Sequence, residues 1–114
     1  MGMRQEQVAT TLSSREKKAL DNVAQEWGLK SGTVLRRLIL FFIQGKITIV
    51  DLVKKTEQED ESQENVHTIR IALSDIEKQS FLSAIKGWDF SVSSIIRRLV
   101  RAFLSGNIPK NDLW

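Results

Sequence analysis

Polar and apolar residues alternate in two short segments of the chain, and each alternation predicts a β-strand. Residues 68–73 read Thr-Ile-Arg-Ile-Ala-Leu, and residues 7–12 read Gln-Val-Ala-Thr-Thr-Leu. A period of two gives a strand one buried and one exposed face. The inward residues are Ile69, Ile71 and Leu73 in one segment and Val8, Thr10 and Leu12 in the other. Thr10 is a poor core residue, so the earlier strand is the weaker prediction.

Each predicted strand is followed by a helical pattern. Ser13 and Glu16, and again Ser74 and Glu77, form the Ser-x-x-Glu sequence of a capping box, which marks the start of a helix. Apolar residues then recur at helical spacing. The two stripes are Leu20, Val23, Ala24 and Trp27, and Phe81, Ala84, Ile85 and Trp88. We expect both tryptophans to pack in the core. Gly28 suits the left-handed residue that ends such a helix, with Asp89 as its substitute.

A second helix is predicted after each of these. Its apolar residues are Val34, Leu35, Leu38, Ile39, Phe42 and Ile43, matched later by Ile95, Ile96, Leu99, Val100, Phe103 and Leu104. Gly45 and Gly106 are placed to end the two helices. Leu52 and Leu113, with Trp114, are expected to dock on the core.

These patterns are two copies of one internal repeat. Residues 7–53 align with residues 68–114 at an offset of 61, with 13 identities in 47 pairs and no gap. We therefore predict a first repeat over 7–53, an acidic linker over 54–66 and a second repeat over 67–114. One copy has a single unpaired strand and buries too little surface to fold alone. The expected fold is one intertwined, mainly helical domain over 1–114, with a two-stranded antiparallel ribbon and four main helices.

The charge of the chain is unevenly distributed. Its 17 basic and 14 acidic residues give a net charge of +3, but residues 56–65 contain five carboxylates and no cation. Without that stretch the basic residues outnumber the acids by eight, which favours a polyanionic partner. The longest apolar run, residues 38–43, is far too short to span a membrane. The absence of cysteine is compatible with a reducing, cytoplasmic environment.

Catalytic and metal-binding patterns are missing from the sequence. The chain has one histidine, His67, and no cysteine or tyrosine. It has no glycine-rich phosphate loop and no metal-ligand spacing. We therefore expect neither an enzyme nor a metal or cofactor site.

The order of strand, polar cap, helix, turn and helix resembles the ribbon-helix-helix DNA-binding proteins, the class of the Arc and MetJ repressors. Many members show Gly-x-Ser-x-Ser-x-φ-φ-Arg at the second helix. Residues 89–97 (Asp-Phe-Ser-Val-Ser-Ser-Ile-Ile-Arg) and 28–36 (Gly-Leu-Lys-Ser-Gly-Thr-Val-Leu-Arg) follow it loosely. The resemblance covers about 90 of the 114 residues. Most members are homodimers, whereas this chain resembles a covalent pseudo-dimer, as in the tandem proteins of conjugative plasmids.

The resemblance implies a specific DNA-binding surface. The outward residues of the two strands would read bases in the major groove: Gln7, Ala9, Thr11, Thr68, Arg70 and Ala72. The start of each second helix would bind a backbone phosphate, through Lys30, Ser31, Gly32 and Thr33 in one repeat and Ser91, Ser93 and Ser94 in the other. Because the two strands differ at every outward pair, we expect an asymmetric DNA site, with more affinity from the Arg70 strand.

The function expected from this resemblance is sequence-specific binding of double-stranded DNA by a small bacterial, plasmid or phage regulator, most simply a repressor. One alternative is a protein-interaction module on the same scaffold, such as an antitoxin-like partner binder. Another is an accessory factor for DNA processing in conjugation or partition. If the chain binds DNA, adjacent DNA sites would encourage self-association. The acidic linker is either an inert tether or a segment that folds over the ribbon.

Overall fold

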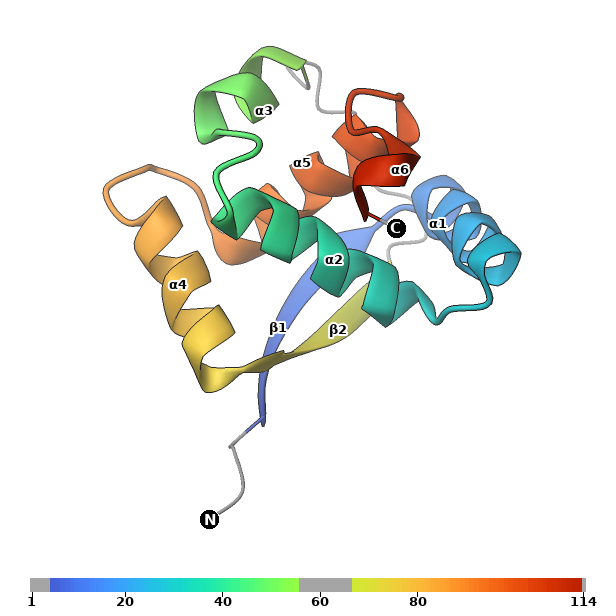
Figure 1. The fold of residues 1–114 in the computed structure, drawn as a ribbon, viewed down its shortest axis with the longest axis horizontal. Helices are drawn as coiled ribbons and strands as arrows, with labels where there is room; N and C mark the ends of the chain where they lie inside the picture. The colour runs from blue at the N-terminus through green and yellow to red at the C-terminus, as the bar shows by residue number, and fades with distance from the viewer. Residues whose placement is uncertain (1–4, 56–66, 114) are drawn as a thin grey trace.

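The computed structural model describes residues 5–55 and 67–113 (Figure 1). The chain is mostly helical with one two-stranded antiparallel sheet, which confirms that part of the predicted fold. In chain order the elements are β1 (Gln5–Leu12), α1 (Ser14–Trp27), α2 (Ser31–Ile43), α3 (Ile49–Lys55), β2 (His67–Ser74), α4 (Asp75–Ile85), α5 (Val92–Leu104) and α6 (Lys110–Leu113).

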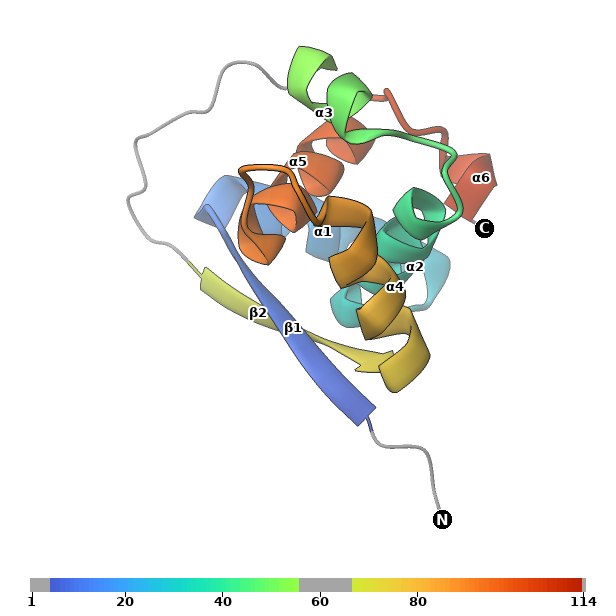
Figure 2. The same cartoon turned by 90° about the vertical axis from the view of Figure 1, so that its left-hand side faces the viewer.

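The two strands form a ribbon that carries the helices on one side only (Figure 2). β1 pairs with β2 over eight residues each, from Gln5 opposite Ser74 to Leu12 opposite His67. The predicted alternation is confirmed, because the inward residues are buried or half-buried and face the helices. Thr10 is only 1% exposed, yet its hydroxyl donates a 2.8 Å hydrogen bond to the backbone carbonyl of Ser93. This bond satisfies the one polar side chain that is buried among the described residues of the ribbon.

Both predicted capping boxes are present. The Ser13 hydroxyl accepts from the Glu16 amide and the Glu16 carboxylate accepts from the Ser13 amide, at 3.2 and 3.0 Å. Ser74 and Glu77 make the same pair of bonds at 3.1 and 2.8 Å. Gly28 follows α1 with φ of 69°, a left-handed conformation that glycine adopts without strain. Each strand therefore passes directly into a helix whose start is fixed by local sequence.

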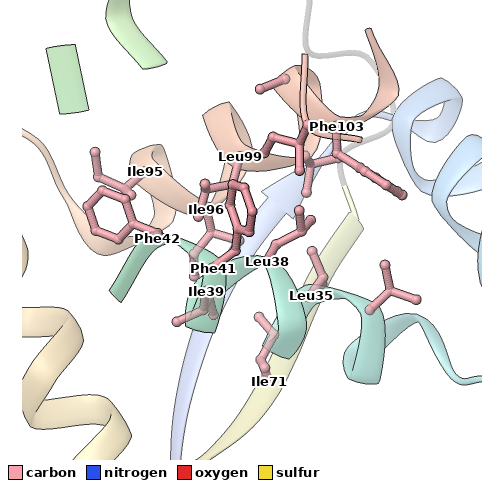
Figure 3. Packing of buried hydrophobic residues seen from close by; sticks show 14 of the residues in the cluster. Leu35, Leu38, Ile39, Phe41, Phe42, Ile71, Ile95, Ile96, Leu99 and Phe103 are labelled. Atoms are coloured by element: carbon pink, nitrogen blue, oxygen red, sulfur yellow. The ribbon is translucent and has the colours of Figure 1, made fainter. Parts of the chain in front are cut away.

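The core lies between α2 and α5, above the inward face of the ribbon (Figure 3). α5 packs on β1 and α2 packs on β2, so each of these helices covers the strand that belongs to the other repeat. Phe42 of α2 meets Phe81 of α4 edge to face at 5.7 Å between ring centroids. Trp27 of α1 meets Phe103 of α5 in the same way at 5.9 Å. The two halves of the chain thus share one core.

The structure corrects the prediction for the helix after β2. α4 ends at Ile85, Lys86 is extended, and Gly87 has a φ of 88°. This left-handed turn ends the helix three residues before the position that Trp27 occupies in α1. Ala84 is exposed, and Trp88 is 47% exposed instead of packing in the core. The expected apolar stripe therefore stops at Ile85.

The segments after α2 and α5 each contain a short helix. α3 begins at Ile49 and α6 begins 61 residues later, at Lys110. As predicted, Leu52 and Leu113 are buried, at 0% and 6% exposure. α3 extends through Lys55, so the first two residues of the predicted linker are helical. The rest of that linker, and Trp114, lie outside the described residues.

Candidate nucleic-acid interface

The side of the ribbon turned away from the helices carries all six residues expected to read bases. We call Gln7, Ala9, Thr11, Thr68, Arg70 and Ala72 the outer face of the ribbon. Thr11 is half-buried and the other five residues are exposed. In Figure 2 the helices lie above and to the right of the ribbon, and no helix covers its other side. The strand alternation alone determines this placement, because a shift of one residue would turn all six side chains into the core.

The strand register arranges these six residues as three cross-strand pairs. Gln7 faces Ala72, Ala9 faces Arg70, and Thr11 faces Thr68. The guanidinium of Arg70 therefore rises from the middle of the outer face, opposite a methyl group. Neighbouring pairs lie about 6.8 Å apart along the strands, two residues at about 3.4 Å each. The outer face is a short row in which one cation stands between neutral side chains.

The start of α5 lies beside β1. The hydroxyl of Ser91 accepts from the Ser94 amide at 3.1 Å and caps the helix. The hydroxyl of Ser93 donates to the Thr10 hydroxyl oxygen at 3.3 Å. Two of the three expected phosphate-binding serines thus have intramolecular hydrogen bonds. The first amides of a helix have no intrahelical acceptor and carry the positive end of the helix dipole, so an anion is favoured there.

The start of α2 lies beside β2 and differs in charge. Lys30 is exposed at the N-cap position and makes no side-chain capping bond. A Cβ added to Gly32 would come within 3.8 Å of the Arg70 carbonyl oxygen, so the first turn of α2 lies against the middle of β2. Thr33 is half-buried in the same turn. The start of α2 therefore lies beside β2, near the middle of the ribbon, whereas the start of α5 lies beside β1.

A carboxylate already occupies the neighbourhood of this second helix start. The Ser31 hydroxyl donates to Asp21 of α1, and the same carboxylate accepts from Lys17 at 2.8 Å. The hydrogen bonds from Lys17 and Ser31 hold the pKa of Asp21 below its ordinary value. Asp21 is therefore ionised at neutral pH and places a negative charge next to α2. In the second repeat its counterpart is Leu82.

Two arginines at the same repeat position make different contacts near the ribbon. Arg97 of α5 donates to Thr11 twice, to the carbonyl oxygen at 3.1 Å and to the hydroxyl at 2.8 Å. Its counterpart Arg36 would meet Ala72, which has no hydroxyl, and instead donates to Glu77 at 2.5 Å. Arg97 therefore fixes the hydroxyl of Thr11 at one end of the outer face. The counterpart position at the other end, Ala72, has no hydroxyl to fix.

The sequence alone did not identify Asp21 or Arg97 as parts of this surface. Lys17 and Asp21 are four residues apart on a helix, which signals an ion pair. However, the contact of Asp21 with Ser31 depends on how α1 packs against α2. The contact of Arg97 with Thr11 joins residues 86 positions apart. Both contacts require the assembled fold, so no local pattern reveals them.

Comparison with known proteins adds no identification: no family model, no curated protein and no solved structure matches this chain. Within residues 5–55 and 67–113, no helix is long and apolar enough to cross a membrane. In the same part of the chain no three acidic or histidine side chains cluster as metal ligands would. His67 lies exposed at the start of β2, with its Nε2 3.0 Å from the Ser14 hydroxyl.

Proposed function

We propose that this chain is a ribbon-helix-helix DNA-binding protein that inserts its ribbon into the major groove and acts as a small transcriptional regulator. The observation that carries the proposal is the uncovered outer face, with Arg70 at its centre and a helix start beside each strand. A two-stranded ribbon is narrow enough for a major groove about 12 Å wide. Arginine is the side chain most often used to read guanine there, through its O6 and N7 atoms.

We further propose that the two repeats form a single-chain pseudo-dimer. The strand register supports this arrangement, because Ala9 faces Arg70 and these two residues are counterparts in the repeat. The flanking pairs exchange in the same way. The cross-packing of α2 on β2 and of α5 on β1 is the arrangement that a two-fold relation between the repeats would produce.

The charge of the chain supports a polyanionic partner. Arg70 and Lys30 are exposed on or beside the ribbon. In the described residues the outer face itself contains no carboxylate, and the densest acidic stretch is in residues 56–65. Phosphate contacts at the helix starts would hold the ribbon in register, while contacts to base edges would give specificity.

The test compares Arg70→Ala with the matched control Lys110→Ala. Lys110 is an exposed cation in α6, on the far side of the helices from the ribbon (Figure 2). Using DNA recovered by selection from a random double-stranded library, we expect Arg70→Ala to weaken binding roughly 10- to 100-fold, because one arginine–guanine contact contributes about 1–3 kcal/mol. We expect Lys110→Ala to change binding less than about twofold. Equal binding by Arg70→Ala and the unchanged protein would contradict the ribbon model.

A protein-interaction module is the second candidate function. Three large apolar side chains on or just after α4 favour it: Ile76, Leu82 and Trp88 are 71%, 41% and 47% exposed. Exposed apolar residues that cluster on one element are typical of protein interfaces. If the chain binds no DNA even at low salt, this candidate replaces the first.

A further inference from the structure

The central pair of the outer face lies where a two-fold axis between the strands would pass. Ala9 and Arg70 face each other directly, and they are also the same position of the two repeats. In a ribbon made of identical strands this pair would be two copies of one side chain, one for each DNA strand. Here one copy is a methyl group and the other is a guanidinium. The two-fold symmetry is therefore broken at the pair through which the axis itself would pass.

The flanking pairs break the symmetry in the same direction. Gln7 with Ala72 presents an amide and a methyl group on one side of Arg70. Thr11 with Thr68 presents two hydroxyls on the other side. Gln7 and Thr68 are counterparts in the repeat, as are Thr11 and Ala72. Along the ribbon the outer face therefore presents an amide, then a guanidinium, then hydroxyls. The order is different when the ribbon is followed from the other end.

The surroundings of the ribbon are polarised as well. The carboxylate of Asp21 in α1 accepts a hydrogen bond from Ser31 at the start of α2, whereas Ser91 caps the start of α5 and the second repeat has Leu82 in place of Asp21. Arg97 contacts Thr11, whereas its counterpart Arg36 contacts Glu77. The two helix starts therefore present different charges to a backbone phosphate, with Lys30 and Asp21 at α2 and with Ser91, two residues after Asp89, at α5. The residues expected to contact bases differ between the two ends of the ribbon. The helix starts expected to contact phosphates differ as well.

We propose that the chain binds a non-palindromic DNA core in one fixed orientation, with a single guanine at its centre contacted by Arg70. This inference rests on the proposed function. Three pairs about 6.8 Å apart span about five base pairs at 3.4 Å per step. Gln7 suits an adenine on its side of the core, since an amide pairs with adenine N6 and N7. The threonine methyls suit thymine on the other side.

The experiment is selection from a random double-stranded library with the full chain and with the exchanged variant Ala9→Arg/Arg70→Ala. The unchanged chain should recover a core with one central guanine and no inverted symmetry. The exchanged variant should recover the same flanks with that guanine moved to the opposite DNA strand. In direct titrations, inverting the central G·C pair should weaken binding of the unchanged chain about tenfold and strengthen binding of the exchanged variant. Both changed positions are exposed, and circular dichroism with thermal melting checks the fold.

The outcomes separate the inference from the proposed function. A palindromic core, or the same central preference in both proteins, would overturn the fixed orientation while leaving DNA binding intact. Absence of binding to any DNA at low salt would overturn the proposed function itself. If the exchanged variant has a lower melting temperature than the unchanged chain, the single variant Arg70→Ala tests the fixed orientation instead. It should bind the two orientations of the central pair equally, and retained discrimination would contradict the role of Arg70.

Discussion

Glu16 and Glu77 occupy the same position of the two repeats and close the same capping box, but their carboxylates pair with different arginines. Glu16 accepts from Arg101 of α5 at 2.8 Å, and both side chains are largely buried, at 15% and 17% exposure. Glu77 accepts from Arg36, whose side chain is 45% exposed. Burial disfavours the charge on Glu16, yet bonds from Arg101 and the Ser13 amide hold its pKa below the ordinary value. The pair of Glu16 with Arg101 is less exposed than the pair of Glu77 with Arg36. Its loss should therefore cost more of the free energy of unfolding.

Replacing these glutamates with glutamine should therefore have unequal effects. We expect Glu16→Gln to lower the free energy of unfolding by about 1–3 kcal/mol, because the partly buried guanidinium of Arg101 then loses the negative charge with which it pairs. Glu77→Gln should lower it by less than about 1 kcal/mol, as for ion pairs near the surface. Urea denaturation at pH 7 measures both values. Equal losses would contradict this expectation and would show that burial of the arginine contact adds nothing to stability.

The same glutamate predicts a pH dependence. Because the pKa of Glu16 is lower in the folded chain than its ordinary value of 4.5, ionised Glu16 stabilises the fold above pH 4.5. That contribution is lost as the pH falls through the lower, folded pKa. The stability difference between the unchanged chain and Glu16→Gln should shrink in acid. A difference that stays constant from pH 7 to about pH 3 would contradict the assignment.

At the scale of elements, the starts of α2 and α5 are alike in backbone but unlike in charge. Both helices begin after an extended residue, Lys30 or Ser91, and both abut a strand. At the start of α2 the hydroxyl of Ser31 is hydrogen-bonded to the carboxylate of Asp21. If DNA phosphates approach both helix starts, this carboxylate opposes one of the two contacts.

Asp21→Asn should accordingly tighten DNA binding about two- to fivefold, the effect of about 0.3–1 kcal/mol for one charge at a helix end. The dependence of binding on salt should become steeper. Glu26→Gln is the matched control, since Glu26 is an exposed acid on the same helix. Fluorescence titrations at several salt concentrations measure the effect. The same gain from both variants would indicate a general effect of net charge.

The elements that depend on local sequence were predictable, and the contacts between distant elements were not. The alternation of residues 68–73 and the two capping boxes specify strands and helix starts within a few positions. The prediction that Trp88 packs in the core was wrong. Its spacing continues the apolar stripe of α4, but the helix ends before it at the left-handed Gly87. The outer face followed from alternation alone. The contacts of Asp21 and Arg97 depend on helix packing, which the one-dimensional pattern does not contain.

At the scale of the whole molecule, both halves of the chain contribute residues to one apolar core. β1 has no strand partner except β2 in the described part of the chain, and α2 and α5 each cover the strand of the other repeat. The apolar core is therefore assembled from both repeats, and neither repeat alone encloses it.

Cutting the chain between its repeats tests this dependence. A protease site inserted within residues 56–66 would allow cleavage after folding. We expect the two pieces to stay together and to elute as one species, because strand pairing and the shared core join them. Their thermal midpoint should fall on dilution, since unfolding now separates two chains, whereas that of the uncut protein should not. Two separately folded pieces would contradict the intertwined domain.

The central claim, that the ribbon enters the major groove, is tested most directly by methylation interference on the selected DNA. Methylation of guanine N7 alters the major groove, and methylation of adenine N3 alters the minor groove. We predict that binding is blocked when the guanine at the centre of the site is methylated at N7 and is unaffected by methylated adenine N3. Interference at adenine N3 without interference at guanine N7 would contradict the account.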